Sequence, residues 1–294
     1  MGLSEYKEDL FVRYNHFLNK RVTFKQKTAF IRSLLVELQS MAPDIKVVEL
    51  REKGTKKSLS RNVYVGDVKT ADVIIATYFD SPLYHLGPYY ILDKEKQQNS
   101  TLIFNGLVSG ILLLLGIVFT LFVTNKMLPM GSQHINWILL VGIGFIYLLL
   151  IYLISMFSKG VGRKRNIVRN NSTIIYLIDK VLRNKESSKK IAYAFLDNGV
   201  TNERGLYGLQ ASVKKNSKIL YLDSIGSMEK IQYIYEDNGE FRQTSTFSKN
   251  GIYRIFPARH EENSYFLTSK DLNSTSYSDI NSDIVDEVIT QLIK

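Results

Sequence analysis

Two long apolar runs in the middle of the chain constrain its fold more than any other feature. Residues 102–124, "LIFNGLVSGILLLLGIVFTLFVT", and residues 135–157, "INWILLVGIGFIYLLLIYLISMF", contain no charged residue. Each run is long enough to cross a hydrocarbon core of about 30 Å as a helix. Neither run is N-terminal in this sequence, so we do not expect a cleaved secretion signal. The sequence therefore predicts two transmembrane helices rather than two core helices of a soluble domain.

The residues around these runs predict how the chain crosses the membrane. The linker "NKMLPMGSQH" is short and favours an antiparallel hairpin, and its only fixed charge is Lys126. The segment after the second run, "SKGVGRKRNIVR" (158–169), contains five cations. Because positive loops stay in the cytoplasm, we expect the soluble parts and both termini to be cytoplasmic, at the plasma membrane. We expect the lipid bilayer to be a partner and the basic segment to contact anionic head groups.

Composition excludes several kinds of chemistry. The chain of 294 residues has no cysteine, which excludes disulfides, thiolate metal sites and cysteine nucleophiles. We find no glycine-rich phosphate loop and no serine nucleophile elbow. The formal net charge is +10, but no aromatic and basic motif of a known nucleic-acid reader is present, so we expect no nucleic-acid partner.

The soluble parts predict alternating strands and helices. Residues 5–41 form two amphipathic helices broken near Arg21, and Thr23 is the expected N-cap of the second. We predict strands at residues 45–50, 61–68, 71–78, 189–198 and 218–226, and helices at residues 171–184, 204–215 and 282–294.

This alternation predicts the α/β class, with a mostly parallel (mixed) sheet and helices on both faces. The expected α/β/α sandwich comprises residues 1–100 and 159–294, interrupted by a hairpin at residues 101–158. Asp80, Asp197 and Asp223 follow three predicted strands. Because sites in parallel sheets lie at the carboxyl ends of strands, we expect these three carboxylates on one rim.

Several segments, in order along the chain, resemble one enzyme family. They are "RNVYVGDVKTADVIIATYFDSP", "RNNSTIIYLIDKVL", "KKIAYAFLDNGVTNERGLYGLQA", "KILYLDSIG" and "FLTSKDLNSTSYSDINSDIVDEVITQL". Together they resemble the zinc aminopeptidases of metallopeptidase family twenty-eight, and most of all a Firmicute branch with transmembrane helices inserted in the peptidase domain. The resemblance implies a phosphorylase/peptidase-like fold and, in active members, two zinc ions that activate a water molecule.

The sequence departs from the family pattern at most positions that would bind zinc. The first metal-binding histidine falls on Tyr78, the bridging aspartate on Arg169 and the last histidine on Leu267. The general-base glutamate falls on Asn202 or, with another gap placement, on Gly199. Neither an amide nor a glycine takes up a proton, so we expect no catalytic residue.

Three carboxylates of the family pattern are kept. Asp80 matches the aspartate that orients the first histidine, Glu203 matches a second glutamate, and Asp223 matches the next metal ligand. Glu203 and Asp223 are weak candidates for one hard cation, but we expect no dinuclear centre and no cofactor. Because buried carboxylates need a counter-charge, we expect Arg169 to pair with Asp80, Glu203 or Asp223.

These observations favour a membrane-anchored, catalytically inactive aminopeptidase-like protein. It would be a binding or scaffold module for an unknown protein or peptide, for example in a peptide-export or bacteriocin-linked membrane complex. One alternative is an active zinc aminopeptidase with shifted ligands, using His85 or His260. Another is an immunity or partner protein that acts through its hairpin, where "GLVSG" and "GIG" allow close helix packing.

Overall fold

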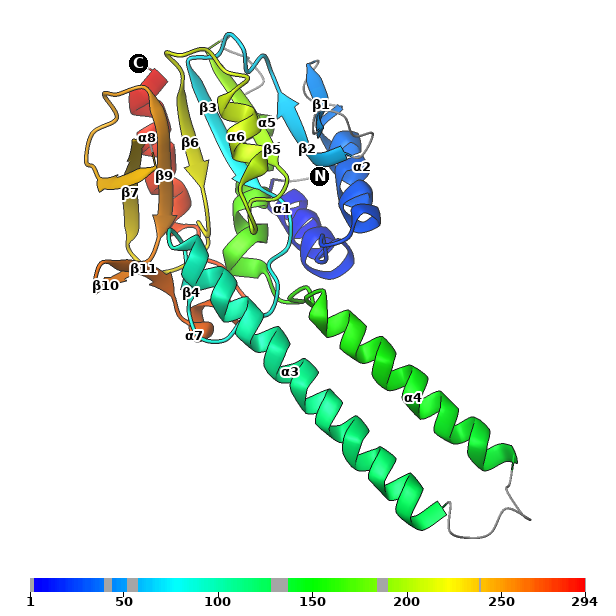
Figure 1. Ribbon diagram of the computed structural model, residues 1–294. Helices are drawn as coiled ribbons and strands as arrows, with labels where there is room; N and C mark the ends of the chain where they lie inside the picture. Colours follow the sequence, from blue (N-terminus) through cyan, green and yellow to red (C-terminus); the bar gives the residue numbers. More distant parts are fainter. Residues whose placement is uncertain are drawn as a thin grey trace. The chain divides into compact units, whose positions relative to one another are not determined.

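The structure is a computed structural model that describes residues 3–39, 44–51, 58–127, 137–183, 190–237 and 239–293. Contacts between residues divide the chain into two compact units. The first, which we call the α/β unit, contains Met1–Pro82, Pro88–Lys94 and Arg163–Lys294. The second, which we call the helical unit, contains Leu83–Gly87 and Glu95–Gly162. Figure 1 shows the elements of both units.

The α/β unit is built on a mixed sheet. In the described residues its strand order is β1-β2-β5-β3-β6-β9-β7-β8. The strands are β1 (Ile45–Arg51), β2 (Ser58–Val65), β3 (Val73–Tyr78), β5 (Ile191–Leu196), β6 (Lys218–Leu222), β7 (Ile231–Asp237), β8 (Glu240–Gln243) and β9 (Gly251–Pro257). The four central strands, β5, β3, β6 and β9, run parallel, and the outer pairs are antiparallel. The predicted mixed α/β class is confirmed, with its parallel part confined to the centre.

Helices cover both faces of this sheet, as predicted. Four helices share one core with Val73 and Ile75 of β3. They are α1 (Leu3–Val12), α2 (Phe24–Gln39), α5 (Ser172–Arg183) and α8 (Ile280–Ile293). On the other face, α6 (Arg204–Gln210) packs with Ile74 and Ala76. Alternate side chains of a strand point to opposite faces, so the fully buried strand β3 is covered on both sides.

The break between the N-terminal helices lies where the sequence predicts it. A π-helical turn, η1 (Arg13–Phe17), ends the first helix. The Gln26 N–H donates to Thr23 Oγ1 (3.3 Å) and the Thr23 N–H donates to Gln26 Oε1 (3.0 Å), which forms a capping box at the start of α2. Arg21 is fully buried and donates to Asn170 and Asn171, so the break attaches these helices to the segment before α5.

The C-terminal third contains strands that were not predicted from the sequence. They are β7, β8, β9, β10 (Arg259–Glu261) and β11 (Ser264–Leu267), and the last two form a small sheet with β4 (Tyr89–Tyr90) from the segment before α3. A short helix, α7 (Ser269–Leu272), follows β11. The predicted helix 204–215 ends early, at Gln210. The Ser212 hydroxyl donates to the Gly208 carbonyl (2.7 Å), a local bond that competes with continued helix.

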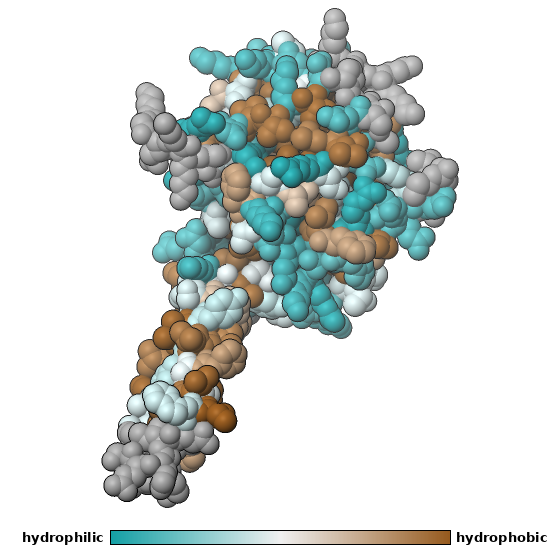
Figure 2. Space-filling model, turned by 90° about the vertical axis from the view of Figure 1, so that its right-hand side faces the viewer, coloured by the Kyte–Doolittle hydropathy of each residue, from teal (hydrophilic) through white to brown (hydrophobic). Residues whose placement is uncertain are grey.

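The helical unit contains two long helices that pack against each other. They are α3 (Lys94–Phe122), extended by η2 (Val123–Met127), and α4 (Trp137–Ser158). The Thr120 and Tyr147 hydroxyls are 2.8 Å apart, and the Phe119 and Tyr147 rings meet edge to face. Both helices are long and apolar enough to cross a membrane, by length and composition. Their most apolar stretches are not buried, and Figure 2 shows brown, apolar side chains along this unit.

Candidate functional site

The parallel centre of the sheet brings the three predicted carboxylates to one rim. Asp197 directly follows β5, Asp223 directly follows β6, and Asp80 lies two residues after β3. Since β3 pairs in parallel with both β5 and β6, the three strands end at the same edge. All three side chains are buried. The prediction that these residues share a rim is confirmed.

Asp223 accepts hydrogen bonds from three hydroxyl groups. Tyr78 donates to Oδ1 (3.0 Å), Ser224 donates to the same oxygen (2.8 Å), and Tyr89 donates to Oδ2 (2.6 Å). Burial raises the pKa of both tyrosines, and the Asp223 charge raises it further. The phenols therefore keep their protons and act as donors. Both carboxylate oxygens of Asp223 are occupied by protein donors.

Arg169 lies beside these two tyrosines. Its Nε donates to the Tyr78 hydroxyl (3.4 Å), and its guanidinium lies 3.4 Å from the centre of the Tyr89 ring. Burial lowers the pKa of Arg169, but the two tyrosines and Asp223 outweigh this and raise it, so the side chain stays charged. The predicted direct ion pair with Asp80, Glu203 or Asp223 is not formed. Arg169 is linked to Asp223 indirectly, because it contacts the Tyr78 hydroxyl and the Tyr89 ring, and both tyrosines bond to Asp223.

Glu203 has different counter-ions. Arg254 on β9 donates to both of its oxygens (2.8 and 2.7 Å), and Lys94 Nζ lies 2.9 Å from Oε1. Burial raises the pKa of Glu203, but the two cations outweigh it and lower the pKa to about 2. Arg254 also pairs with Glu236 (2.8 Å). Glu203 is thus an ionised carboxylate held by two cations.

Asp80 fixes the loop that follows β5. It accepts the backbone N–H groups of Gly199 (2.7 Å) and Val200 (3.1 Å). Burial raises the pKa of Asp80 to about 6, and the nearby Asp197 charge adds to the shift, while Lys27 opposes it. Lys27 itself pairs with Asp197. In this structure Asp80 orients a backbone loop, not a histidine.

The two alternative positions for the general base lie in different environments. Gly199 lies against Tyr78, and a β-carbon added to Gly199 would be 2.2 Å from Tyr78 Cβ. Asn202 is exposed, and its Oδ1 accepts the backbone N–H of Arg204 (3.3 Å). The side chain of Tyr78 therefore fills the space that a side chain at position 199 would need. The nearby Tyr221 hydroxyl is buried and has no hydrogen-bond partner among the described residues.

Leu267 lies next to the same cluster. It is fully buried and pairs with Tyr89 through the backbone of β11 and β4. Thr268 caps α7 and forms a capping box with Asp271. The two polar residues that follow Leu267 in the family-like motif therefore have a helix-capping role here.

The residues at the rim do not fit a zinc centre. The oxygens of Asp223 and Glu203 are already bonded to protein donors. Within the described part of the chain, no three His, Asp or Glu side chains are grouped as metal ligands. His260 is exposed and stacks on Tyr265 (ring centroids 4.3 Å apart), and His85 belongs to the helical unit. His134 lies outside the described residues.

Several residues of this cluster were missed from the sequence. Tyr89 and Lys94 lie on the segment between β3 and the first apolar run, which has no strong periodicity. Arg254 could have been identified from the sequence, because it is the one charge within the apolar strand "GIYRIFP". A charge in a buried strand needs a buried partner. Which carboxylate it meets depends on the strand order, which the sequence does not specify.

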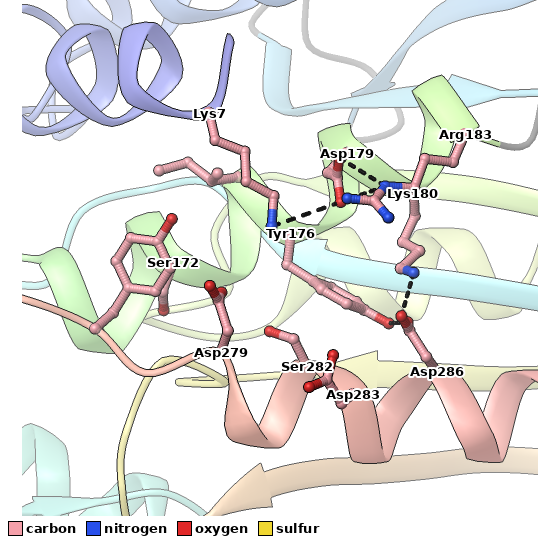
Figure 3. Close-up of a pocket in the computed structure, with 12 residues that line it drawn as sticks. Lys7, Ser172, Tyr176, Asp179, Lys180, Arg183, Asp279, Ser282, Asp283 and Asp286 are labelled. Atoms are coloured by element: carbon pink, nitrogen blue, oxygen red, sulfur yellow. Dashed lines mark hydrogen bonds and ion pairs between the residues drawn. The ribbon is translucent and has the colours of Figure 1, made fainter. Parts of the chain in front are cut away.

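A cavity of about 280 Å³ lies elsewhere in the α/β unit, between α5 and the start of α8 (Figure 3). Charged side chains line it, and some of them form ion pairs. Tyr176 and Lys180 of α5 bond to Asp286 of α8, and Arg183 bonds to Asp179. None of the predicted site residues lines this cavity.

Comparison with known proteins finds similarity to this chain in structure but not in sequence. No protein-family model matches the chain, and a search of curated proteins finds no relative. The structure of Bacteroides thetaiotaomicron glutaminyl cyclase bound to N-acetylhistamine matches with a TM-score of 0.50 and 9% identity, over 98% of this chain and 97% of that one.

Two further solved structures are similar at lower scores. A glutaminyl cyclase from Porphyromonas gingivalis matches with a TM-score of 0.49 and 9% identity, over 98% of this chain and 97% of that one. A zinc-dependent exopeptidase from Parabacteroides distasonis matches with a TM-score of 0.47 and 10% identity, over 98% and 95%. At these identities the likeness concerns the fold alone. The chain therefore shares a mixed α/β fold with the Bacteroides thetaiotaomicron glutaminyl cyclase.

Proposed function

We propose that this protein is a membrane-anchored, catalytically inactive member of the aminopeptidase-like fold that acts as a binding or scaffold module. The observation that carries the proposal is the rim itself. The polar residues at the positions that would hold zinc ligands are instead bonded to one another and to other protein groups. Asp223 is bonded to Tyr78 and Tyr89 beside Arg169, and Glu203 is held by Arg254.

The charge balance at the rim argues against a divalent cation. Around Asp223 and Glu203, the three cations Arg169, Lys94 and Arg254 lie among the three carboxylates Asp223, Glu203 and Glu236. This part of the rim therefore has no excess negative charge to attract a metal ion. A zinc ion would have to displace Arg254 or Lys94 from Glu203, which would leave a buried cation without its partner.

The rim is also closed to solvent. Tyr78 is 1% exposed, and Asp223, Glu203 and Arg169 are each 3% exposed. A peptide end has no access to side chains buried to this extent. We therefore place the binding surface of the proposed module outside the former catalytic rim, so the rim would maintain the fold of the module.

The membrane part of the proposal rests on α3 and α4. Their length, their apolar composition and the exposure of their most apolar stretches suit lipid better than the core of a soluble domain. With the basic segment after α4, we propose that both termini lie in the cytoplasm. A reporter enzyme fused to the C-terminus tests this topology, and activity on the outer side of the cell would overturn it.

The test of inactivity is the metal content of the full chain. The protein is purified in detergent, exposed to zinc, exchanged into metal-free buffer and analysed by mass spectrometry, with an active zinc aminopeptidase as control. We expect far less than one zinc ion per chain. Aminopeptide hydrolysis and cyclisation of N-terminal glutamine are assayed in parallel. Stoichiometric zinc together with either activity would overturn the proposal and favour the alternative of an active enzyme.

One observation favours a second role, for the helical unit as a partner surface. A β-carbon added at Gly106 or Gly110 of α3 would meet no atom within 4 Å, so α4 does not pack closely against these two glycines. Small residues at this spacing allow close helix contact in membranes. Replacing Gly106 and Gly110 by leucine separates the two roles, because partner binding survives this change only if the helices are a simple anchor.

A further inference from the structure

The basic segment after α4 contains both buried and exposed cations. Arg163 is buried and donates to Asn273 Oδ1 (2.6 Å), and Arg169 is buried at the rim. Lys164 and Arg165, which lie between them, are exposed. Of the four cations of this segment that belong to the α/β unit, the fold therefore buries Arg163 and Arg169 and exposes Lys164 and Arg165.

The turn between the N-terminal helices lies directly beside these exposed cations. Asn19 Nδ2 donates to the Lys164 carbonyl (3.4 Å), and Asn166 Nδ2 donates to the Asn19 carbonyl (3.3 Å). On this turn, Lys20 is exposed and Phe17 is 79% exposed. An aromatic ring that is this exposed gains little from the core. The two segments together present one phenyl ring and three cations.

The covalent connection limits how far this surface is from the end of α4. Lys164 follows Ser158, the last residue of α4, by six positions. Six residues extend over about 20 Å at most, whatever the arrangement of the two units. If α4 ends at the membrane surface, Lys164 and Arg165 remain close to that distance from the lipid head groups.

We propose that Phe17, Lys20, Lys164 and Arg165 form a lipid-contacting surface that binds the anionic leaflet. This inference rests on the membrane anchoring proposed above. The phenyl ring enters the interfacial region, where aromatic side chains are favoured. The cations meet phospholipid phosphates, whose negative potential attracts basic residues close to a membrane span. The contact would fix the orientation of the α/β unit on the membrane.

Tryptophan fluorescence of the full chain in vesicles tests this surface. Trp137 is the only tryptophan, and it is the first residue of α4. In the unmodified protein, its quenching by brominated lipid reports whether the hairpin is inserted. In a Trp137→Phe background, Phe17→Trp reports on the proposed surface. Val36→Trp is the matched control, because Val36 of α2 is 72% exposed and lies near the other end of that helix.

We expect brominated phosphatidylglycerol in phosphatidylcholine vesicles to quench the Phe17→Trp variant and not the Val36→Trp variant. Charge reversal by Lys164→Glu with Arg165→Glu, or high salt, should remove the quenching of Phe17→Trp. If Trp137 is quenched while Phe17→Trp responds no more than Val36→Trp, the anchor stands and the lipid-contacting surface is wrong. If Trp137 is not quenched, the membrane anchoring fails and the inference fails with it.

Discussion

Gly199 and Tyr78 face each other at the rim so closely that any β-carbon at position 199 would overlap the tyrosine side chain. Position 199 is one of the two candidates for the general base of an active enzyme. A catalytic glutamate at position 199 and the tyrosine at position 78 therefore exclude each other. A single substitution at position 199 does not restore such a site, because the Tyr78 side chain occupies the space that the new side chain needs.

A double-mutant cycle on this pair is the first prediction. Gly199→Ala should destabilise the protein by about 1–3 kcal/mol, as overpacking in a filled core does. In a Tyr78→Ala background the same change should cost much less, because the ring is gone. The difference is a coupling energy of about 0.5–3 kcal/mol, measured by chemical denaturation in detergent. Strictly additive effects would show that the two residues do not compete for space.

Reversing the charge of Arg169 is the second prediction. Arg169→Asp places a second carboxylate near Asp223 and should cost about 3–5 kcal/mol, the range for leaving a buried charge uncompensated. The control is Arg165→Asp, an exposed cation four residues earlier, which should cost no more than about 0.5 kcal/mol. Thermal unfolding of the two variants, side by side, measures the difference. Equal melting temperatures of the two variants would show that Arg169 does not stabilise the rim.

The third prediction concerns the stability of the folded protein at low pH. The pKa of Glu203 is lowered from 4.5 to about 2 in the folded protein. Its ionised form therefore contributes stability above pH 4.5, and this contribution is lost as the pH falls towards 2. The shift corresponds to about 3 kcal/mol. Glu203→Gln should be less stable at neutral pH and should lose less stability between pH 4.5 and 2. An unchanged slope in that range would contradict the strong pairing with Arg254 and Lys94.

Asp80 should show the opposite pH dependence, which is the fourth prediction. Its pKa is raised from 3.8 to about 6. The folded state therefore binds a proton more tightly than the unfolded state, and stability is lost as the pH rises from about 4 to 6. Asp80→Asn cannot ionise and should remove this decline, by about 3 kcal/mol at most. Denaturation of both proteins at several pH values checks the slope, and a decline that persists in the variant would assign it to another group.

The rim was predictable because it follows from local rules. Buried strands such as "ADVIIATY" are visible in the sequence, and parallel strands bring the residues after them to one edge. Asp80, Asp197 and Asp223 meet there for that reason. The start of α2 was predictable in the same way, from Thr23 as its N-cap.

The partners of these carboxylates were not predictable, because they depend on distant pairings. Arg169 was predicted to be the direct counter-ion, but Tyr78 and Tyr89 lie against its side chain and bond to Asp223. Arg254 meets Glu203 only because β9 pairs with β6. Tyr89 belongs to a two-residue strand, too short for any periodicity to reveal.

The strand order also sets the sequence of events during synthesis. Strand β3 lies between β5 and β6, yet it precedes both long apolar helices in the chain and its two neighbours follow them. While the ribosome makes the residues between Tyr78 and Ile191, β3 has neither of these neighbours to pair with. At about 5–20 residues per second, this interval lasts roughly ten seconds. Under the proposed membrane anchoring, the two apolar helices would be inserted while the central sheet has not yet formed. A failed insertion would then leave an apolar strand exposed to chaperones and proteases.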